Sequence, residues 1–404
     1  MKRKLLSLAA FAACAFAGSA QAQISDGIVK IGVMNDMSGL YSDITGPGSV
    51  TAARMAVEDY IKATKSTLKV EIVSADHQNK PDVGSNVARQ WFDTDKVDMI
   101  ADVPTSSVGL AVAKIASDKG KLHVNSGSAT ADLSGKACNA NTIHWAYDTW
   151  MLANGTGKAI VKSGGNTWFF LTADYAFGHA LERDTEAVVT KNGGRVVGKV
   201  RTPFPTQDFS SFLLQAQASK AKIIGLANAG CDTTNSIKQA AEFGITKGGQ
   251  NLAGLLVFLP DVHSLGLNIA QGLMLTETFY WDLNDNTRAF SKRFAAAQGG
   301  KMPSMVQAGV YSSVIHYLKA VDAAKTDDGT KVAAKMKELP TDDPIFGKGS
   351  VRPDGRKIHP AYLFEVKKPA ESKGPYDYYK LVATIPANEA FRPLAESECP
   401  LVKK

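Results

Sequence analysis

The stretch Ile28-Val29-Lys30-Ile31-Gly32-Val33 is a β-branched, strand-like run, and it opens the alternation that decides the fold. The segment that follows, residues 48–61, carries apolar side chains at helical spacing. The alternation then continues with strands predicted at 68–74, 97–103 and 122–124 and helices predicted at 83–92 and 108–115. This order predicts a parallel sheet with helices on both faces.

A second series of the same kind begins near residue 149. Helices are predicted at 150–161, 177–189, 209–218 and 234–243, and strands at 167–171, 195–200, 223–227 and 252–259. Helices at 289–297 and 306–324 follow, and residues 346–384 read as short strands and turns, among them 361–366 and 379–385. The sequence therefore predicts an α/β protein of two Rossmann-like lobes, each with a parallel sheet, joined by a multi-strand hinge.

The late segments are too short for a third α/β domain, so we expect the chain to return to each lobe in turn. The predicted first lobe comprises residues 25–146 and about 283–345, and the second comprises 147–282 and about 346–390. Residues 391–404 form a C-terminal tail. In open α/β sheets, ligands bind beyond the carboxyl ends of the strands, and two facing lobes would place those ends along one cleft.

The first 22 residues have the features of a signal peptide. Three basic residues precede an apolar stretch from Leu5 to Gly18, and Ala20-Gln21-Ala22 matches the small-x-small cleavage pattern. Cleavage would leave 382 of the 404 residues and lower the formal net charge from +7 to +4. We therefore expect an exported, periplasmic, monomeric protein, and this mild charge gives no reason to expect a nucleic-acid partner.

The cysteines of the predicted mature chain are Cys138, Cys231 and Cys399. One disulfide and one leftover thiol are expected in an oxidising compartment. A Cys138–Cys399 pair is favoured because Cys231 lies beside a strand expected to be buried, but the sequence leaves the connectivity open.

Motifs for enzyme chemistry are absent from the sequence. The segment 46–51 lacks the third glycine of a dinucleotide fingerprint, and 155–159 lacks the spacing of a phosphate loop. No G-x-S-x-G elbow occurs, and the seven histidines show no zinc-ligand spacing. We therefore predict no catalytic residues, no metal and no cofactor.

Two loops that follow successive predicted strands are rich in hydroxyls. Residues 104–108 lead into a helix, where free backbone N–H groups and the macrodipole favour an anion. Residues 125–130 include Gly127, which permits close backbone approach. Either loop alone is equally well explained by helix capping, but the two together favour a carboxylate site.

Aromatic residues occupy the equivalent positions of the second lobe. Tyr175 and Phe177 follow the strand that ends at Leu171, and Tyr147 and Trp150 lie at the crossover between the lobes. Flat rings at strand ends could sandwich a planar ligand, although aromatic residues are more often part of the core.

The chain resembles the periplasmic solute-binding proteins of branched-chain amino acid ABC transporters, the Leu/Ile/Val-binding family with the type I periplasmic binding fold. This resemblance spans nearly the whole predicted mature chain. The segments that carry it are 31–39, 98–107, 125–130 and 174–178. The resemblance implies a binding protein that delivers a small molecule to a membrane permease.

The resemblance also implies roles for individual residues. The loop Thr105–Ser107 and the amides around Gly127–Ala129 would hold the ligand carboxylate, and Phe177 falls where amino-acid binders commonly place a tyrosine. Further contacts are implied near Asn228 and Phe258. The candidate ligand-binding residues are Tyr41, Thr105, Ser106, Ser107, Gly127, Ser128, Ala129, Tyr147, Trp150, Tyr175, Phe177, Asn228 and Phe258.

The sequence departs from the family where amino-acid binders place carboxylates for the ligand ammonium. The crossover reads Tyr147-Asp148-Thr149-Trp150, and the later strand reads Leu255-Leu256-Val257-Phe258. A buried ammonium needs a charged partner, so this apolar wall favours a small aromatic carboxylic acid of the benzoate or phenylpropenoate type. The alternatives are an amino acid or amide bound through Asp148, or Asp174, and an exported α/β enzyme using Asp174 or a histidine.

Overall fold

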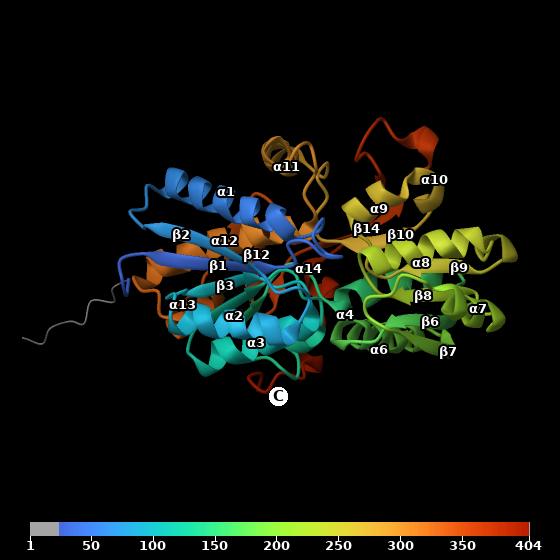
Figure 1. The fold of residues 1–404 in the computed structure, drawn as a ribbon, viewed down its shortest axis with the longest axis horizontal. Coiled ribbons are helices and arrows are strands. Elements are labelled where there is room, and N and C mark those ends of the chain that lie inside the picture. Colours follow the sequence, from blue (N-terminus) through green and yellow to red (C-terminus); the bar gives the residue numbers. More distant parts are fainter. Residues whose placement is uncertain (1–23, 404) are drawn as a thin grey trace, which may run out of the picture.

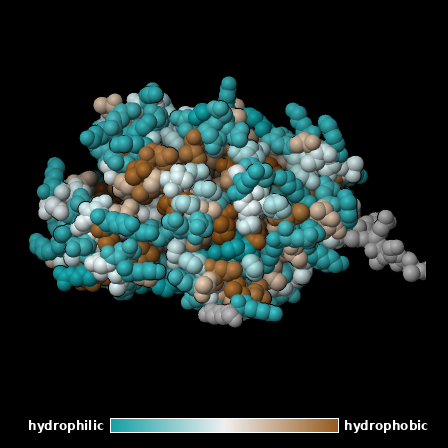
Figure 2. All heavy atoms as spheres, turned by 180° about the vertical axis from the view of Figure 1, so that it is seen from behind, coloured by the Kyte–Doolittle hydropathy of each residue, from teal (hydrophilic) through white to brown (hydrophobic). Residues whose placement is uncertain are grey.

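The computed structural model describes residues 24–403, so the predicted signal peptide lies outside the described residues. Two α/β lobes lie side by side (Figure 1). Within residues 24–403, no helix is long and apolar enough to cross a membrane. Figure 2 shows that hydrophilic residues predominate on one face of the molecule and that apolar atoms gather there in separate patches.

The first lobe is built on a five-stranded parallel sheet with the order β2-β1-β3-β4-β5. The strands are β1 (Val29–Asn35), β2 (Val70–Asp76), β3 (Met99–Asp102), β4 (Leu122–Asn125) and β5 (Thr142–His144). The connecting helices are α1 (Gly46–Thr64), α2 (Pro81–Asp93) and α3 (Ser106–Asp118). Prolines stand in the first turns of α1 and α2, where a missing N–H costs no hydrogen bond.

Later parts of the chain complete the first lobe. They are α11 (Asp285–Ala297), α12 (Met305–Ala324), α13 (Gly329–Glu338), β11 (Thr341–Asp343), β12 (Gly347–Val351) and β13 (Lys357–Ile358). α12 packs along α1, as Figure 1 shows, and α13 contacts both α12 and β12. The start of α12 is fixed by a capping box in which the Ser304 hydroxyl accepts from the Gln307 N–H, and the Gln307 side chain accepts from the Ser304 N–H.

The second lobe contains a four-stranded parallel sheet with the order β7-β6-β8-β9. Its strands are β6 (Thr167–Ala173), β7 (Arg195–Thr202), β8 (Ile223–Ala227) and β9 (Asn251–Gly254). Its helices are α4 (Thr149–Leu152), α5 (Lys158–Lys162), α6 (Ala176–Lys191), α7 (Ser210–Ala218), α8 (Cys231–Glu242), α9 (Leu259–Leu265) and α10 (Leu267–Ala270). An antiparallel sheet of β10 (Met274–Glu277), β14 (Ala361–Val366) and β15 (Tyr379–Ile385) adjoins it, and α14 (Ala387–Ala390) begins the tail.

The predicted α/β class and parallel sheets are confirmed, with three differences in detail. The expected strand 252–259 ends at Gly254, because Pro260 and Asp261 start α9 and the Asp261 carboxylate accepts from the Phe258 N–H at 2.9 Å. The expected helix 150–161 contains a π-helical turn at Ala153–Gly157. Several short elements were not predicted from the sequence: the strands β5, β10 and β11 and the helices α9, α10, α13 and α14.

We propose that the lobes divide as their sheets do, with residues 25–146 and 283–345 in the first lobe and 147–282 in the second. The proposed return to the second lobe shifts from residue 346 to β14, because β12 pairs with β11 and contacts α13. The chain thus crosses between lobes after β5, after β10 and before β14.

The C-terminal tail is tied to both lobes. A disulfide joins Cys138 to Cys399, which is the pairing favoured from the sequence, with the two Cα atoms 5.5 Å apart. Cys231 is a free cysteine that is exposed at the first position of α8, and the strand beside it, β8, is buried as expected. Arg392 of the tail lies 3.3 Å from Asp184 of α6 in the second lobe.

Candidate functional site

A cavity lies between the lobes, with about 270 Å³ of space that no atom fills, part of it open to solvent. Its wall is formed by Tyr41, Ile44, Pro104, Gly127, Ala129, Tyr147, Tyr175, Phe177, Ala229, Leu256, Phe258 and Val306. No charged side chain is among these lining residues.

Most of the wall comes from loops that follow the carboxyl ends of parallel strands. In chain order, Tyr41 follows β1, Pro104 follows β3, Gly127 and Ala129 follow β4, Tyr147 follows β5, Tyr175 and Phe177 follow β6, Ala229 follows β8, and Leu256 and Phe258 follow β9. The expected position of the cleft, at the carboxyl edge of both sheets, is therefore where the cavity lies.

The first-lobe wall requires a glycine at position 127. A Cβ there would lie 2.6 Å from the Pro104 Cα and 2.8 Å from Asp102 Oδ1, so no other residue fits without a shift. Asp102 and Val103, at the end of β3, both have positive φ angles, which turn the chain sharply toward Pro104. The Asp102 carboxyl is fully buried and accepts from Asn35 Nδ2 at 3.2 Å, and burial raises its pKa to about 7.

Tyr147 at the lobe crossover connects the two walls. Its hydroxyl donates to the Gly127 carbonyl at 2.7 Å, and its ring meets Phe258 edge to face with a centroid separation of 6.0 Å. Burial raises the pKa of its phenol, which therefore stays neutral and remains a donor. Tyr147 thus presents an aromatic face held by one hydrogen bond to the first lobe.

Tyr41 and Tyr175 meet across the lobes. Their hydroxyl oxygens are 2.6 Å apart, and burial raises the pKa of both phenols, so both keep the proton that one of them donates. Tyr175 stands immediately before α6, beside Phe177, with a ring separation of 5.8 Å. The second-lobe wall is therefore mainly aromatic.

Seven of the thirteen predicted ligand-binding residues line this cavity: Tyr41, Gly127, Ala129, Tyr147, Tyr175, Phe177 and Phe258. Three of the predicted hydroxyl residues instead make hydrogen bonds within the first lobe. The Thr105 hydroxyl donates to Asn79, Ser106 Oγ accepts from the Thr130 N–H at 3.2 Å, and the Ser128 hydroxyl donates to the Val103 carbonyl. Their side chains brace the loops behind the wall.

The remaining three predicted residues also lie off the cavity wall. Ser107 is half-buried in the first turn of α3. Trp150 lines a groove on the tail side of α4 together with Asn154 and Arg392. Asn228 is buried and accepts from the Thr233 hydroxyl at 2.7 Å, which steadies the start of α8.

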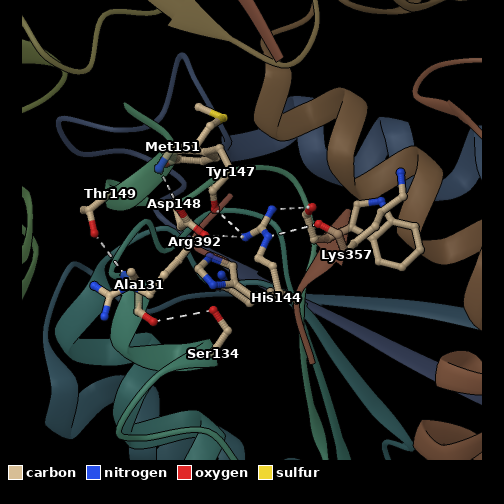
Figure 3. A network of polar contacts seen from close by, with 12 residues as sticks. Ala131, Ser134, His144, Tyr147, Asp148, Thr149, Met151, Lys357 and Arg392 are labelled. Carbon is tan, nitrogen blue, oxygen red and sulfur yellow. Dashed lines mark hydrogen bonds and ion pairs between the residues drawn. The ribbon is translucent and has the colours of Figure 1, made fainter. Parts of the chain in front are cut away.

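Asp148 and Asp174, the two carboxylates considered for an ammonium, are occupied elsewhere. Asp148 caps α4 by accepting from the Met151 N–H at 2.8 Å, and it lies 3.6 Å from Arg356. Figure 3 shows Asp148 among Tyr147, Met151 and Lys357 in this network. Asp174 is exposed and pairs with His179 at 2.7 Å on the surface.

Five of the twelve wall residues were not among the predicted ligand-binding residues: Ile44, Pro104, Ala229, Leu256 and Val306. Ala229 directly follows Asn228 after the end of β8, so the position of that strand could have predicted it. Val306 lies on α12, far along the chain, and only the packing of α12 against α1 brings it here. Residues 24–403 hold no cluster of three or more side chains suited to bind a metal ion.

Comparison with known proteins places this geometry in context. A family model described as periplasmic binding protein matches residues 28–374. A periplasmic binding protein from Burkholderia mallei is 51% identical, with a TM-score of 0.91, and the match covers 94% of this chain and all of that one. A branched-chain amino acid ABC transporter ligand-binding protein from Burkholderia xenovorans is 42% identical with a TM-score of 0.82, covering 93% of this chain and all of that one.

The chain is also similar to more distant relatives. A Leu/Ile/Val-binding protein homologue from Brucella melitensis is 24% identical over 378 residues, covering 90% of this chain and 93% of that protein. A solute-binding protein from R. palustris, solved in complex with benzoate, is 20% identical with a TM-score of 0.79, covering 93% of this chain and all of that one. At that identity the likeness shows the shared fold alone.

Proposed function

This chain belongs to the periplasmic binding proteins that serve ABC transporters, and we propose that its ligand is a small aromatic carboxylic acid, of the benzoate or phenylpropenoate type. The ligand would be captured in the interlobe cavity and delivered to a membrane permease by a monomeric, periplasmic protein. As a member of a family of binding proteins, it would release the ligand unchanged.

The observation that carries the proposal is the composition of the cavity wall. Five aromatic rings line it and no carboxylate does. An amino acid brings an ammonium group that loses water on burial, and without a charged partner this costs several kcal/mol or more. An aromatic acid has no such group, and its ring gains contact with the flat faces of the tyrosines and phenylalanines.

The ligand carboxylate would face the first lobe. Pro104 and Ala129 line the wall there, and α3 begins at Ser106, so the backbone N–H groups of its first turn and its macrodipole favour an anion at this place. The hydroxyls of Thr105, Ser106 and Ser128 would contribute by fixing the two loops, since they are already hydrogen-bonded to neighbouring groups.

A branched-chain amino acid is the second candidate. One relative, 42% identical, is described as a branched-chain amino acid transporter protein, and another, 24% identical, as a Leu/Ile/Val-binding protein homologue. In this reading Asp148 would have to supply the charge for the ammonium. Asp148 is only 2% exposed and already serves the α4 cap and Arg356, so it would have to leave both partners to reach a ligand.

A thermal-shift panel tests the proposal. A ligand at 100 times its Kd adds about 2.7 kcal/mol to the free energy of unfolding, which raises the melting temperature measurably. We expect benzoate, hydroxybenzoates or cinnamate to raise it, and leucine, isoleucine and valine to leave it unchanged. Stabilisation by the amino acids and by none of the aromatic acids would overturn the ligand assignment.

Recovery of the ligand separates binding from turnover. After a day with a stabilising acid, the protein is denatured and the acid is quantified by chromatography. We expect full recovery of the unchanged acid, whereas its steady consumption would favour the enzyme alternative.

A further inference from the structure

Phe204, which does not line the cavity, stacks on the tyrosine that closes it. Phe204 lies in the loop between β7 and α7, and its ring centroid is 4.2 Å from that of Tyr175, with the planes inclined by 25°. Its distance to the Tyr41 ring is 6.0 Å at the same inclination. Phe204 and Tyr175 are both half-buried, so this stack stands at the edge of the site.

The two lobes are in direct contact at this point. Tyr41 belongs to the first lobe and Tyr175 to the second, and their hydroxyl oxygens are 2.6 Å apart. Beside them, a Cβ on Gly230 of the second lobe would lie 2.7 Å from the Leu40 carbonyl oxygen and 3.0 Å from the Tyr41 ring. Only a glycine allows this contact, so the sequence at position 230 is fitted to the closed arrangement.

The loop that carries Phe204 is fixed to its own lobe. The Thr206 N–H donates to Asp232 Oδ1 at 3.1 Å, and the Phe209 N–H donates to Gln239 Oε1 at 2.7 Å. Gln239 also donates from Nε2 to the Gln207 carbonyl at 2.9 Å. Helix α8, which bears Asp232 and Gln239, therefore holds Phe204 in place whether or not the first lobe is near.

We infer that Phe204 is a positioning residue that sets how long the closed cleft retains its ligand, and this inference rests on the proposed function. The Phe204 ring backs the Tyr175 ring and limits its rotation, which keeps the Tyr175 hydroxyl directed at Tyr41. The Tyr41–Tyr175 hydrogen bond then joins the lobes over the cavity. Without the stack, Tyr175 gains rotational freedom, the hydrogen bond forms less often, and the lobes separate sooner.

Ligand dissociation gives the first test. The probe is benzoate, or cinnamate if that acid gives the larger thermal shift. The complex is mixed rapidly with an excess of a competing ligand, and release of the probe is followed by tryptophan fluorescence. Loss of one aromatic stack should accelerate dissociation in Phe204→Ala by about 3-fold to 10-fold, with the association rate nearly unchanged. Phe204→Tyr keeps the ring and should restore the wild-type rate. The matched control is Phe243→Ala, an exposed phenylalanine at the end of α8, which should dissociate at the wild-type rate.

A double-mutant cycle separates positioning from a loss of packing alone. Tyr41→Phe removes the interlobe hydrogen bond and leaves the Phe204–Tyr175 stack in place. If Phe204 acts through that bond, Phe204→Ala should accelerate dissociation far less in the Tyr41→Phe background than in the wild type. Equal accelerations in both backgrounds, or an unchanged rate in Phe204→Ala, would overturn the inference.

Small-angle X-ray scattering distinguishes failure of this inference from failure of the proposed function. If no aromatic acid binds the wild type, the proposed function fails, and the role of Phe204 is judged on the ligand-free proteins. Phe204→Ala should then have a larger radius of gyration than the wild type and Phe204→Tyr should not. Equal radii for all three would overturn the role of Phe204.

Discussion

The interlobe cavity and the hinge are both rich in aromatic rings, but they differ in charge: the cavity wall has no charged side chain, and the hinge has buried ones. The cavity wall has five aromatic residues and no charged side chain. The hinge, by which we mean residues 145–148 and 356–359 at two of the crossovers between the lobes, contains two fully buried cations, Arg356 and Lys357. Their charges lie over the rings of Phe391, Trp145 and Phe346.

Each of the two buried cations of the hinge lies within ion-pair distance of a carboxylate. The Arg356 guanidinium donates to the carbonyls of Trp145 and Tyr147, both at 2.8 Å, and to that of Lys357 at 3.1 Å. It also lies 3.6 Å from Asp148, and Lys357 lies 3.6 Å from Asp343. Asp148 belongs to this hinge set and does not line the cavity, so the comparison supports the proposal of a ligand without an ammonium group.

The largest expected effect tests the hinge. Arg356→Met leaves three carbonyls and Asp148 without their donor, which should lower the free energy of unfolding by about 3–5 kcal/mol. Urea denaturation at pH 7 measures the loss, and Arg356→Lys, which keeps the charge but not the planar fork, should lose less.

Arg293, on the surface, is the matched control for Arg356. Arg293 pairs with Asp59 at 2.7 Å with half of its side chain exposed, so Arg293→Met should cost only about 0–1 kcal/mol. Similar losses at the two arginines would contradict the contrast between hinge and surface.

Asp102, which lies against Gly127 of the cavity wall, gives the next largest effect, and this effect depends on pH. Burial raises its pKa from the usual value near 3.8 to about 7. The folded protein therefore binds this proton more tightly than the unfolded chain does. As the pH rises from about 4 through 7, the free energy of unfolding should fall by about 2–4 kcal/mol.

Asp102→Asn tests that pH dependence, because an amide cannot ionise and asparagine tolerates a positive φ. The free energies of unfolding of wild type and variant should converge near pH 4, and the variant should be the more stable at pH 8. A difference between the two proteins that does not change between pH 4 and 8 would show that Asp102 does not titrate near 7.

A smaller effect is expected at Tyr147, within the cavity. Tyr147→Phe leaves the Gly127 carbonyl without its donor, which should weaken binding of an aromatic acid by about 10-fold. The control is Tyr60→Phe, which removes a hydroxyl that donates to Asp322 at 2.6 Å in the first lobe, away from the cavity. Equal affinities for wild type and Tyr147→Phe would remove Tyr147 from the site.

The smallest effect on affinity is expected at Asp148. Asparagine can still cap α4, and Asp148 does not line the cavity, so Asp148→Asn should change the Kd for an aromatic acid by less than about 3-fold. Calorimetric titration measures this change. Abolished binding would instead make Asp148 a ligand contact and favour the amino-acid reading.

Much of the fold was predictable because each predicted strand is an apolar or alternating run and each predicted helix has apolar residues at helical spacing. The run 252–259 was the exception, since a short apolar segment fits a strand or a helix equally well until Pro260 and Asp261 are seen to start α9.

The candidate site was predictable to the level of loops, because strand ends converge at one edge of a parallel sheet. The direction of a side chain within a loop was not. Thr105 and Ser128 turn to partners in their own lobe, and Trp150 turns to the groove beside the tail, because tertiary contacts decide these directions. Arg356 and Lys357 were not singled out from the sequence, and only the packing of the hinge buries them.

The central claim, that the cavity accepts an aromatic acid without an amine, is tested most directly by isothermal titration with matched pairs of ligands. L-Phenylalanine and 3-phenylpropanoate differ only in the α-ammonium, as do L-leucine and 4-methylpentanoate, so the set separates the ring from the charge. We predict that 3-phenylpropanoate binds at least about 100-fold more tightly than phenylalanine, because the ammonium has no partner in the cavity. Binding of phenylalanine or leucine as tight as that of its amine-free partner would contradict the claim.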